Sequence, residues 1–500
     1  MVAPTGTYDV IIIGAGVGGL TCGALLAKHG LSVLVAEQHT KVGGYCTGYR
    51  RRGFTFDVPH VFTGWREGSR IRGIISHIGA DRYVDAVELE KTFILWFPDR
   101  RVQCYADRRR YEAQLIEHFP EERKGIRRFF ADTAQVWRRP AEQGVVSQPI
   151  PFRRYLSRYI ADERLMEVLC SGWWWYSGLS PERVDTLSIL NMIHSFDAWG
   201  AWRPKGGFQN LADALARCVT EAGGHVSTGR RISEILTDCR EVRGVVFEDG
   251  EQVLSHKVVS NADSKRTFLD LLPRRATPPS LTHKVRGFRM SPSCVSVHLG
   301  LGIDLPHTLA CGCVLVCPRY GLTEESFRLH DAGQMQMDPS LLQVGISFPS
   351  LSDATLATPG EQVVDLTHFP VPYVWRNVWQ SRNQEAYTGL KAEVAQALVR
   401  AATRALPELS TSPVVQDVAS PLTYQRYTGA TNGAIYDVAC TPDQSSIRRL
   451  PTTTPVPGLY VTGAKTMYGS GIAPAIYSGF ATADTVLGGQ LTEAKVADGF

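Results

Sequence analysis

The sequence predicts a mixed α/β fold built from a discontinuous dinucleotide-binding unit and a second, α+β unit. Residues 8–37 read as a buried strand, a glycine-rich turn, a helix of small residues and a second strand that ends in an acid. Alternating apolar runs between residues 289 and 414 indicate a second sheet, mixed or antiparallel. Residues 91–203 differ in character and contain segments of helical period, which predict a helical insertion.

The first element carries a G-x-G-x-x-G pattern at Gly14, Gly16 and Gly19, as in a Rossmann-type dinucleotide site. Gly14 permits the tight turn, Gly16 leaves room for a pyrophosphate, and Gly19 lets the helix pack closely on the sheet. The phosphates would lie at the helix N-terminus, where free N–H groups favour negative charge. Glu37 follows the first glycine by 37 − 14 = 23 residues, close to the spacing of an acid that binds ribose hydroxyls. The alternatives are a turn that binds nothing and a membrane span over 10–27, which its five glycines argue against.

Composition excludes several classes of protein. The 500 residues are 44% hydrophobic and 20% charged, enough for a large core in two or three domain-sized units. The net charge of +4 is too small to indicate a nucleic-acid partner. Eleven scattered cysteines, and no basic segment before Val10, predict a reduced, cytoplasmic chain without a signal peptide. Cys311, Cys313 and Cys317 alternate along one expected strand with no nearby histidine, so buried thiols are favoured over a metal site.

Two further motifs follow the second strand. Gly43-Gly44 offers bare backbone to the same dinucleotide, and Gly53 to Asp57 (G-F-T-F-D) reads as a turn into a short strand. Together with the fingerprint and Glu37, this order resembles the phytoene desaturase, carotenoid cis–trans isomerase and retinol saturase group of flavoproteins, which are relatives of the amine oxidases. The resemblance implies FAD as the bound dinucleotide. It covers nearly the whole chain and is loose only between residues 64 and 91.

The insertion is rich in arginine and in aromatic residues. Its arginines include Arg100, Arg101, Arg108, Arg109, Arg110, Arg127, Arg128, Arg138, Arg139, Arg153 and Arg154. They form either a solvated helical surface or a basic face that rests on anionic lipid. Trp173 to Tyr176 (W-W-W-Y) either pack between helix and sheet or form the wall of a tunnel for a long apolar ligand.

The chain then returns to the dinucleotide unit. Pro204 to Gly207 (P-K-G-G) resembles the family's return segment near the flavin, and Ile232 matches the position whose backbone meets the adenine. Near the C-terminus, a strand, a glycine turn at Gly463 to Gly471 and a helix from about Ile472 would aim backbone N–H groups at the flavin. The family usually has an acid at the position of Ala464, so this variant looks closer to the isomerase and saturase branches.

These expectations define the domains and the site. The FAD-binding domain takes residues 1–90, 204–288 and 415–500, and the substrate-binding domain takes 91–203 and 289–414. The residues expected to bind FAD are Gly14, Gly16, Val17, Gly18, Gly19, Glu37, Gln38, Gly43, Gly44, Tyr45, Asp57, Pro59, His60, Ile232, Gly463, Ala464, Gly471, Ile472 and Ala473. The candidates for a catalytic polar group are His60, Lys205, Lys465 and Tyr468, each of which has a supporting or surface role as its alternative.

The resemblance implies an FAD-dependent oxidoreductase that desaturates, saturates or isomerises a long apolar polyene or prenoid, with possible contact to a membrane surface. It is consistent that no Ser-His-Asp, Cys-His or paired-carboxylate pattern is found, because the flavin carries the redox chemistry. A flavin amine or amino-acid oxidase, or a tailoring oxidase of secondary metabolism, is the alternative, and the polar segment 425–437 keeps it open. A non-catalytic carrier that only binds FAD is a third hypothesis.

Overall fold

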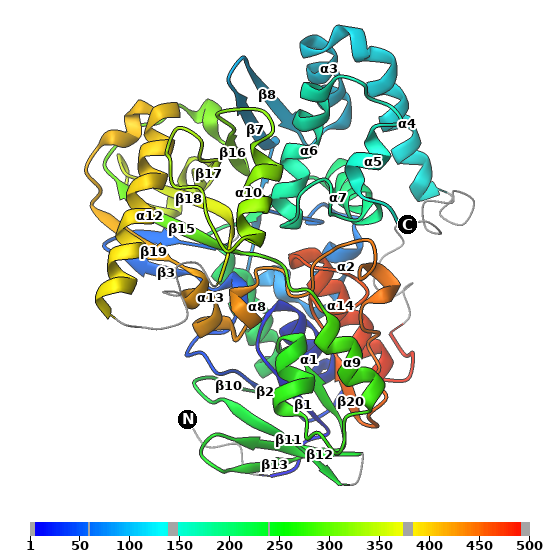
Figure 1. The fold of residues 1–500 in the computed structure, drawn as a ribbon. Helices are drawn as coiled ribbons and strands as arrows, with labels where there is room; N and C mark the ends of the chain where they lie inside the picture. Colours follow the sequence, from blue (N-terminus) through cyan, green and yellow to red (C-terminus); the bar gives the residue numbers. More distant parts are fainter. Residues whose placement is uncertain (1–5, 59–60, 139–148, 239–240, 374–383, 492–500) are drawn as a thin grey trace.

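The computed structural model describes residues 6–58, 61–138, 149–238, 241–373 and 384–491. Two sheets dominate the molecule, and helices pack on both of them (Figure 1). The mixed α/β class, with a Rossmann-type unit and a second mixed sheet, is confirmed.

The dinucleotide unit is a parallel five-stranded sheet in the order β10-β2-β1-β14-β20. Its strands are β1 (Val10–Ile13), β2 (Val33–Ala36), β10 (His225–Ser227), β14 (Val258–Ser260) and β20 (Leu459–Val461). One face of this sheet is covered by the helices α1 (Val17–Lys28), α8 (Phe208–Glu221) and α14 (Ile472–Val486). Val10 and Ile12 of β1 belong to the core on this face. Ile11 and Ile13 face the opposite core. Because both faces are covered, β1 is an uninterrupted apolar run.

Smaller elements complete this unit. The opposite core contains an antiparallel sheet of β11 (Ile232–Asp238), β12 (Glu241–Phe247) and β13 (Gln252–Leu254), together with α9 (Pro279–Gly287). Two further small sheets pair β3 (Tyr49–Arg51) with β4 (Phe54–Phe56), and β9 (Ala201–Pro204) with β5 (Phe62–Thr63) and β6 (Ala86–Leu89). Helix α2 (Arg70–Ile78) packs against α14.

The second sheet has seven strands in the order β19-β15-β18-β17-β16-β7-β8. They are β7 (Lys91–Phe97), β8 (Arg100–Tyr105), β15 (Ser293–Leu301), β16 (Cys313–Val316), β17 (Val344–Ser347), β18 (Gln362–Val371) and β19 (Val415–Ala419). All neighbours are antiparallel except β16 and β7. Residues 91–105 are therefore a hairpin of this sheet and not part of a helical insertion. Strand β19 pairs with β15, although the boundary expected at 415 assigns it to the other domain.

Helices cover both faces of the seven-stranded sheet. On one face lies α12 (Gln384–Ala405), at the left in Figure 1. On the other lies the helical layer: α3 (Arg108–His118), α4 (Arg123–Arg138), α5 (Phe152–Leu156), α6 (Glu163–Ser177) and α7 (Thr186–Trp199). Three shorter helices also pack against strands of this sheet. Helices α10 (Leu322–Asp331) and α11 (Pro349–Ser352) contact β18, and α13 (Pro421–Thr428) contacts β15 and β19.

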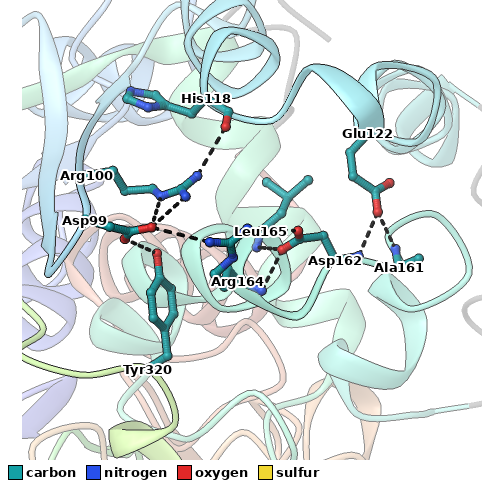
Figure 2. A network of polar contacts seen from close by, with 9 residues as sticks. All are labelled: Asp99, Arg100, His118, Glu122, Ala161, Asp162, Arg164, Leu165 and Tyr320. Atoms are coloured by element: carbon teal, nitrogen blue, oxygen red, sulfur yellow. Dashed lines mark hydrogen bonds and ion pairs between the residues drawn. The ribbon is translucent and has the colours of Figure 1, made fainter.

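A polar network connects the helical layer to the β7–β8 turn (Figure 2). Asp99 accepts hydrogen bonds from Arg100 at 2.7 Å and from the Tyr320 hydroxyl at 2.8 Å, and it faces Arg164 at 3.6 Å. The bond from Arg100 is the largest cause that lowers the pKa of Asp99 to about 2. Asp162 accepts from two backbone N–H groups at the start of α6 and so caps that helix.

Many of the insertion's arginines have partners in the described residues. Arg100 pairs with Asp99, Arg110 with Glu90, Arg127 with Glu112 and Arg153 with Glu182. Arg101 and Arg128 lie over aromatic rings. Exposed pairs of this kind add little stability, but they reduce the net positive charge of the surface. Among the described helices, none has both the length and the apolar composition that crossing a membrane requires.

The cysteines of the described residues are free thiols. Burial raises the pKa of Cys311 and of Cys317 to about 12, so both are neutral at physiological pH. In the described part of the chain, no three metal-ligating side chains lie close enough together to hold an ion.

Candidate functional site

One cavity of about 880 Å³ lies between the two sheets and is lined by residues from both units. This volume is near the upper end for ligand pockets. One end is formed by the glycine turn before α1, the segment 43–46, residues 230–232 and the turn 463–471. The other end, here called the substrate arm, is formed by α6, α7, β5 and the nearest strands of the seven-stranded sheet.

Two helix N-termini open into the first end. Helix α1 begins after Gly16 and α14 begins after Gly471. Because both N-cap residues are glycines, no side chain caps either helix. The first-turn N–H groups of both helices therefore lack a capping side chain, which suits an anionic or carbonyl-rich ligand. A Cβ at Gly469 would meet no atom within 4 Å, so bare backbone borders open space there. These features fit a dinucleotide such as FAD.

Asn261 lies at the centre of the glycine turns, directly after β14. A Cβ on Gly16 would come 2.7 Å from its Nδ2, and a Cβ on Gly18 would come 3.1 Å from its Oδ1. Its amide also donates to the Gly14 carbonyl at 3.4 Å. A side chain at position 16 would therefore have to displace the Asn261 amide from the glycine turns. Asn261 was not among the residues expected to bind FAD, although its position directly after a parallel strand was the available signal.

The acid at the end of β2 lines the same end of the cavity. Glu37 accepts hydrogen bonds from the backbone N–H groups of Ala15 and His39, both at 2.8 Å. Burial is the main cause that raises the pKa of Glu37. Each carboxylate oxygen keeps a further lone pair for a ribose hydroxyl. Nearby, Arg230 pairs with Asp249 through Nη2 at 2.7 Å, while its buried Nη1 has no partner in the described residues.

The C-terminal turn carries a cluster of buried charges. Lys465 donates from Nζ to the Thr462 carbonyl at 2.8 Å and to the Ser260 carbonyl at 3.3 Å. Burial is the main cause that lowers its pKa to about 8, and the nearby Asp437 opposes this shift. Burial likewise raises the pKa of Asp437 to about 6. Arg449 is completely buried and donates to the Val438 and Ala464 carbonyls, so it holds the turn that carries Ala464.

Most of the residues expected to bind FAD line this cavity. They are Gly14, Gly16, Val17, Gly18, Glu37, Gln38, Gly43, Gly44, Tyr45, Ile232, Gly463, Ala464, Gly471, Ile472 and Ala473. Lys465 and Tyr468 line it as well. Pro59 and His60 lie outside the described residues.

Three expected site residues lie away from the cavity. Gly19 packs against the backbone of Gly14, the helix–sheet contact expected of it. Asp57 forms a buried ion pair with Arg203 at 2.6 Å and accepts from the Phe208 backbone N–H, so its role is to hold β9 and α8. Lys205 points to the surface, where its Nζ pairs with Asp85 at 2.7 Å. Asp57 and Lys205 are therefore not among the residues that line the cavity, and their roles in the site stay predictions.

The aromatic run on α6 divides into two pairs. Trp173 and Trp174 are buried in the core, where Trp174 packs edge-on against Phe369. Trp175 and Tyr176 line the substrate arm. Packing between helix and sheet is therefore confirmed for Trp173 and Trp174, whereas Trp175 and Tyr176 border the cavity, because consecutive helical residues point in different directions. Tyr176 stacks on Phe196 of α7, with ring centroids 5.8 Å apart and an interplanar angle of 19°.

Comparison with known proteins gives a consistent result. Residues 17–487 match the family described as flavin containing amine oxidoreductase. The chain is 27% identical to all-trans-retinol 13,14-reductase of Danio rerio, over 97% of this chain and 86% of that protein. It is 28% identical to the lycopene-forming phytoene desaturase of Pantoea ananas, over 95% of this chain and 98% of that protein.

A solved structure shares the fold. An oxidoreductase from Methanosarcina mazei superimposes with a TM-score of 0.67 and 17% identity, over 95% of this chain and 99% of that one. The two curated relatives have nearly equal identity to this chain, so their identities do not separate the saturase and desaturase branches.

Proposed function

Because the chain belongs to the family of flavin-containing amine oxidoreductases, we propose that it acts on the carbon–carbon bonds of a long apolar polyene or prenoid. It is an FAD-dependent oxidoreductase, and the proposed reaction is a desaturation, a saturation or a cis–trans isomerisation. The names of the retinol reductase and the phytoene desaturase to which it is similar support this substrate class.

The observation that carries the proposal is the wall of the substrate arm. Its lining side chains include Val58, Val61, Phe62, Trp175, Tyr176, Leu187, Met192, Phe196, Trp199 and Phe369. None of these is charged, and together they offer an apolar and aromatic surface, alongside the polar lining residues Thr63, Ser188, Asn191 and Ser195. Such a surface binds an extended hydrocarbon through buried area and ring contacts and not through a charged anchor.

The residues at the other end would hold the cofactor. The N-termini of α1 and α14 and the backbone at Gly43 and Gly44 would bind the pyrophosphate and the flavin ring. When bound, FAD supplies the acceptor or donor of a hydride. Trp175 and Tyr176 would keep water from the reacting carbons and hold the polyene in place. Lys465 and Tyr468 remain the candidates for moving a proton, and both line the cavity.

An amine or amino-acid oxidase is the less supported alternative. Such an enzyme needs a free polar anchor for its substrate. The lining acids Asp263 and Asp437 already accept hydrogen bonds, from Thr431 and Ser264 respectively, at 2.8 and 2.7 Å.

The test is aerobic incubation of the purified holoenzyme with long polyenes carried in liposomes, with a parallel anaerobic sample in which the flavin is first reduced. We expect the polyene absorption spectrum to shift, or a new geometric isomer to appear on chromatography. Peroxide formation with small amines or amino acids, together with unchanged polyenes, would contradict the proposal.

Contact with a membrane surface stays a separate prediction. Flotation of the protein with anionic liposomes should weaken as salt is added. Flotation that does not depend on salt would argue against an electrostatic contact.

A further inference from the structure

The segment 435–437 connects the two ends of the cavity and lines it throughout. On the substrate side, the Tyr436 ring packs at the end of α6, where a Cβ on Gly178 would come 2.6 Å from its Cδ2. On the cofactor side, Ser470 of the C-terminal turn donates a hydrogen bond to the Tyr436 carbonyl at 2.6 Å. Asp437 therefore lies at the junction between the substrate arm and the cofactor end.

Two acids line this part of the cavity, and their hydrogen bonds differ. Asp263 is 8% exposed and accepts from three backbone N–H groups and from the Thr431 hydroxyl, so its carboxylate serves to hold these segments together. Asp437 is half-buried, and among the described residues its side chain accepts only from Ser264. The Ser264 hydroxyl bonds to Oδ1 at 2.7 Å and the Ser264 N–H bonds to Oδ2 at 3.2 Å. A carboxylate has about four acceptor positions, so Asp437 can still take up a proton.

The backbone of Asp437 is held in an uncommon conformation. Its φ of 56° lies in the left-handed region, which asparagine and aspartate adopt more readily than other residues with a side chain. The Ser291 N–H donates to the Asp437 carbonyl at 2.8 Å, and the buried Arg449 donates to the next carbonyl, that of Val438. Asparagine would suit this backbone equally well and would bury no charge. The turn therefore explains the short polar side chain, and the carboxyl group needs another reason.

Neighbouring charges leave Asp437 free to change its protonation state. The charged and titratable groups that face it are Asp263, Tyr45, Arg449 and Lys465. Burial is the largest cause that raises the pKa of Asp437 to about 6, and the charge of Asp263 adds to it, whereas Lys465 opposes it. Among the described residues, the Lys465 ammonium donates to two backbone carbonyls and to neither acid. A carboxyl group of this kind can act as an acid or a base near neutral pH.

We propose that Asp437 is a catalytic residue whose Oδ2 takes a proton from the substrate carbon next to the one that loses a hydride, or gives that proton in the reverse direction. In a desaturation, two C–H bonds on neighbouring carbons break. One hydrogen leaves with its electron pair as the hydride that bound FAD accepts. The other leaves as a proton to Oδ2, and its electron pair becomes the new C=C bond. A saturation runs through the same steps in reverse. This inference rests on the proposed function and adds the acid–base group that its hydride transfer requires.

The test follows the flavin absorption of the holoenzyme in anaerobic single turnovers between about pH 5 and 8. Oxidised enzyme mixed with a partly saturated polyene reports desaturation, and prereduced enzyme mixed with a polyene reports saturation. The desaturation rate should rise with pH through about 6, because the base must be ionised, and the saturation rate should fall through the same range, because the acid must be protonated. Asp437→Asn should lower the rate about 10²- to 10⁴-fold and remove the pH dependence.

Three further measurements separate catalysis from a structural role. Asp437→Asn should keep the wild-type FAD content and the wild-type dissociation constant for the polyene, because the amide suits the same backbone. Asp437→Glu, which keeps a carboxyl group, should retain the pH dependence at a reduced rate. Infrared difference spectra should show a carboxyl band that titrates near pH 6 in the wild-type enzyme and is absent from Asp437→Asn.

The outcomes distinguish this inference from the proposed function. An unchanged rate and pH profile in Asp437→Asn, or the loss of its FAD or of its polyene binding, would overturn the catalytic role. A wild-type enzyme that binds the polyene without any flavin reduction or reoxidation would also overturn it and would leave isomerisation as the proposed reaction. A wild-type enzyme that holds FAD and binds no polyene would contradict the proposed function itself.

Discussion

Gly479 forms a close contact between α1 and α14, the two helices expected to bind the cofactor. It lies in the interior of α14, and a Cβ placed there would come 2.5 Å from the carbonyl oxygen of Gly18 in α1 and 2.8 Å from Thr21 Cβ. Ordinary contact begins near 3.4 Å, so Gly479→Ala forces the helices apart by up to 3.4 − 2.5 = 0.9 Å. Gly18 belongs to the first turn of α1, and the displacement therefore reaches the expected pyrophosphate site directly.

The expected magnitude follows from two opposing effects. Alanine gains roughly 1 kcal/mol over glycine in a helix interior, whereas overpacking a closed contact costs about 1–3 kcal/mol. Gly389→Ala is the matched control, because Gly389 is inside α12 and its Cβ would meet nothing within 4 Å. Both substitutions gain the same helix propensity, so this gain cancels when the two variants are compared. Their free energies of unfolding should therefore differ by the overpacking cost of about 1–3 kcal/mol.

The assay is titration of the apoprotein with FAD, together with thermal unfolding of the holoprotein. Gly479→Ala should raise the dissociation constant for FAD about tenfold or more and should unfold at a lower temperature than Gly389→Ala. The control should bind FAD as the wild type does. Equal FAD affinity and equal unfolding temperature in the two variants would refute the idea that α1 and α14 form one rigid cradle.

Three further predictions address the site. Gly16→Ala should lower the amount of FAD bound per chain, because the new Cβ would come 2.7 Å from Asn261 Nδ2 and would displace that amide. Unchanged FAD content would contradict this geometry. Arg203→Met should lower the free energy of unfolding by about 3–5 kcal/mol, because it leaves the Asp57 carboxylate buried without its ion-pair partner. The unfolding temperature should fall, and the folded protein should keep its normal FAD content. Lost FAD with normal stability would instead indicate that Asp57 acts in the FAD site. Wild-type stability should rise between pH 8 and 10, because Lys465 releases its proton near pH 8 when folded but near 10.5 when unfolded. Lys465→Met should remove that rise, measured as unfolding temperature against pH, and a rise that persists would contradict the assignment.

The sequence predicts the cofactor end of the cavity well. Glycine turns and an acid after a strand are local features, so Gly14, Glu37 and Gly471 could be located from spacing alone. The ion pair of Asp57 could not be predicted, because an acid that ends a strand looks the same in sequence whether it faces a ligand or an arginine. Its partner Arg203 is 146 residues away.

The remaining parts of the site depend on contacts between distant segments. Asn261 and Arg449 were not among the expected site residues, and each becomes recognisable only when the fold places it against the cavity. The hairpin β7–β8 lies in the segment expected to be a helical insertion, although two strands joined by a short turn leave a local signal; its parallel partner β16, more than 200 residues later in the chain, leaves none. Parallel pairing over such a distance leaves no local signal.

The most direct test of the account is the FAD content of the purified protein. FAD released by denaturation and measured against protein concentration should amount to one molecule per chain, as expected for a cavity that both helices α1 and α14 border. A colourless protein that takes up no FAD on reconstitution would contradict the assignment of that cavity and, with it, the proposed chemistry.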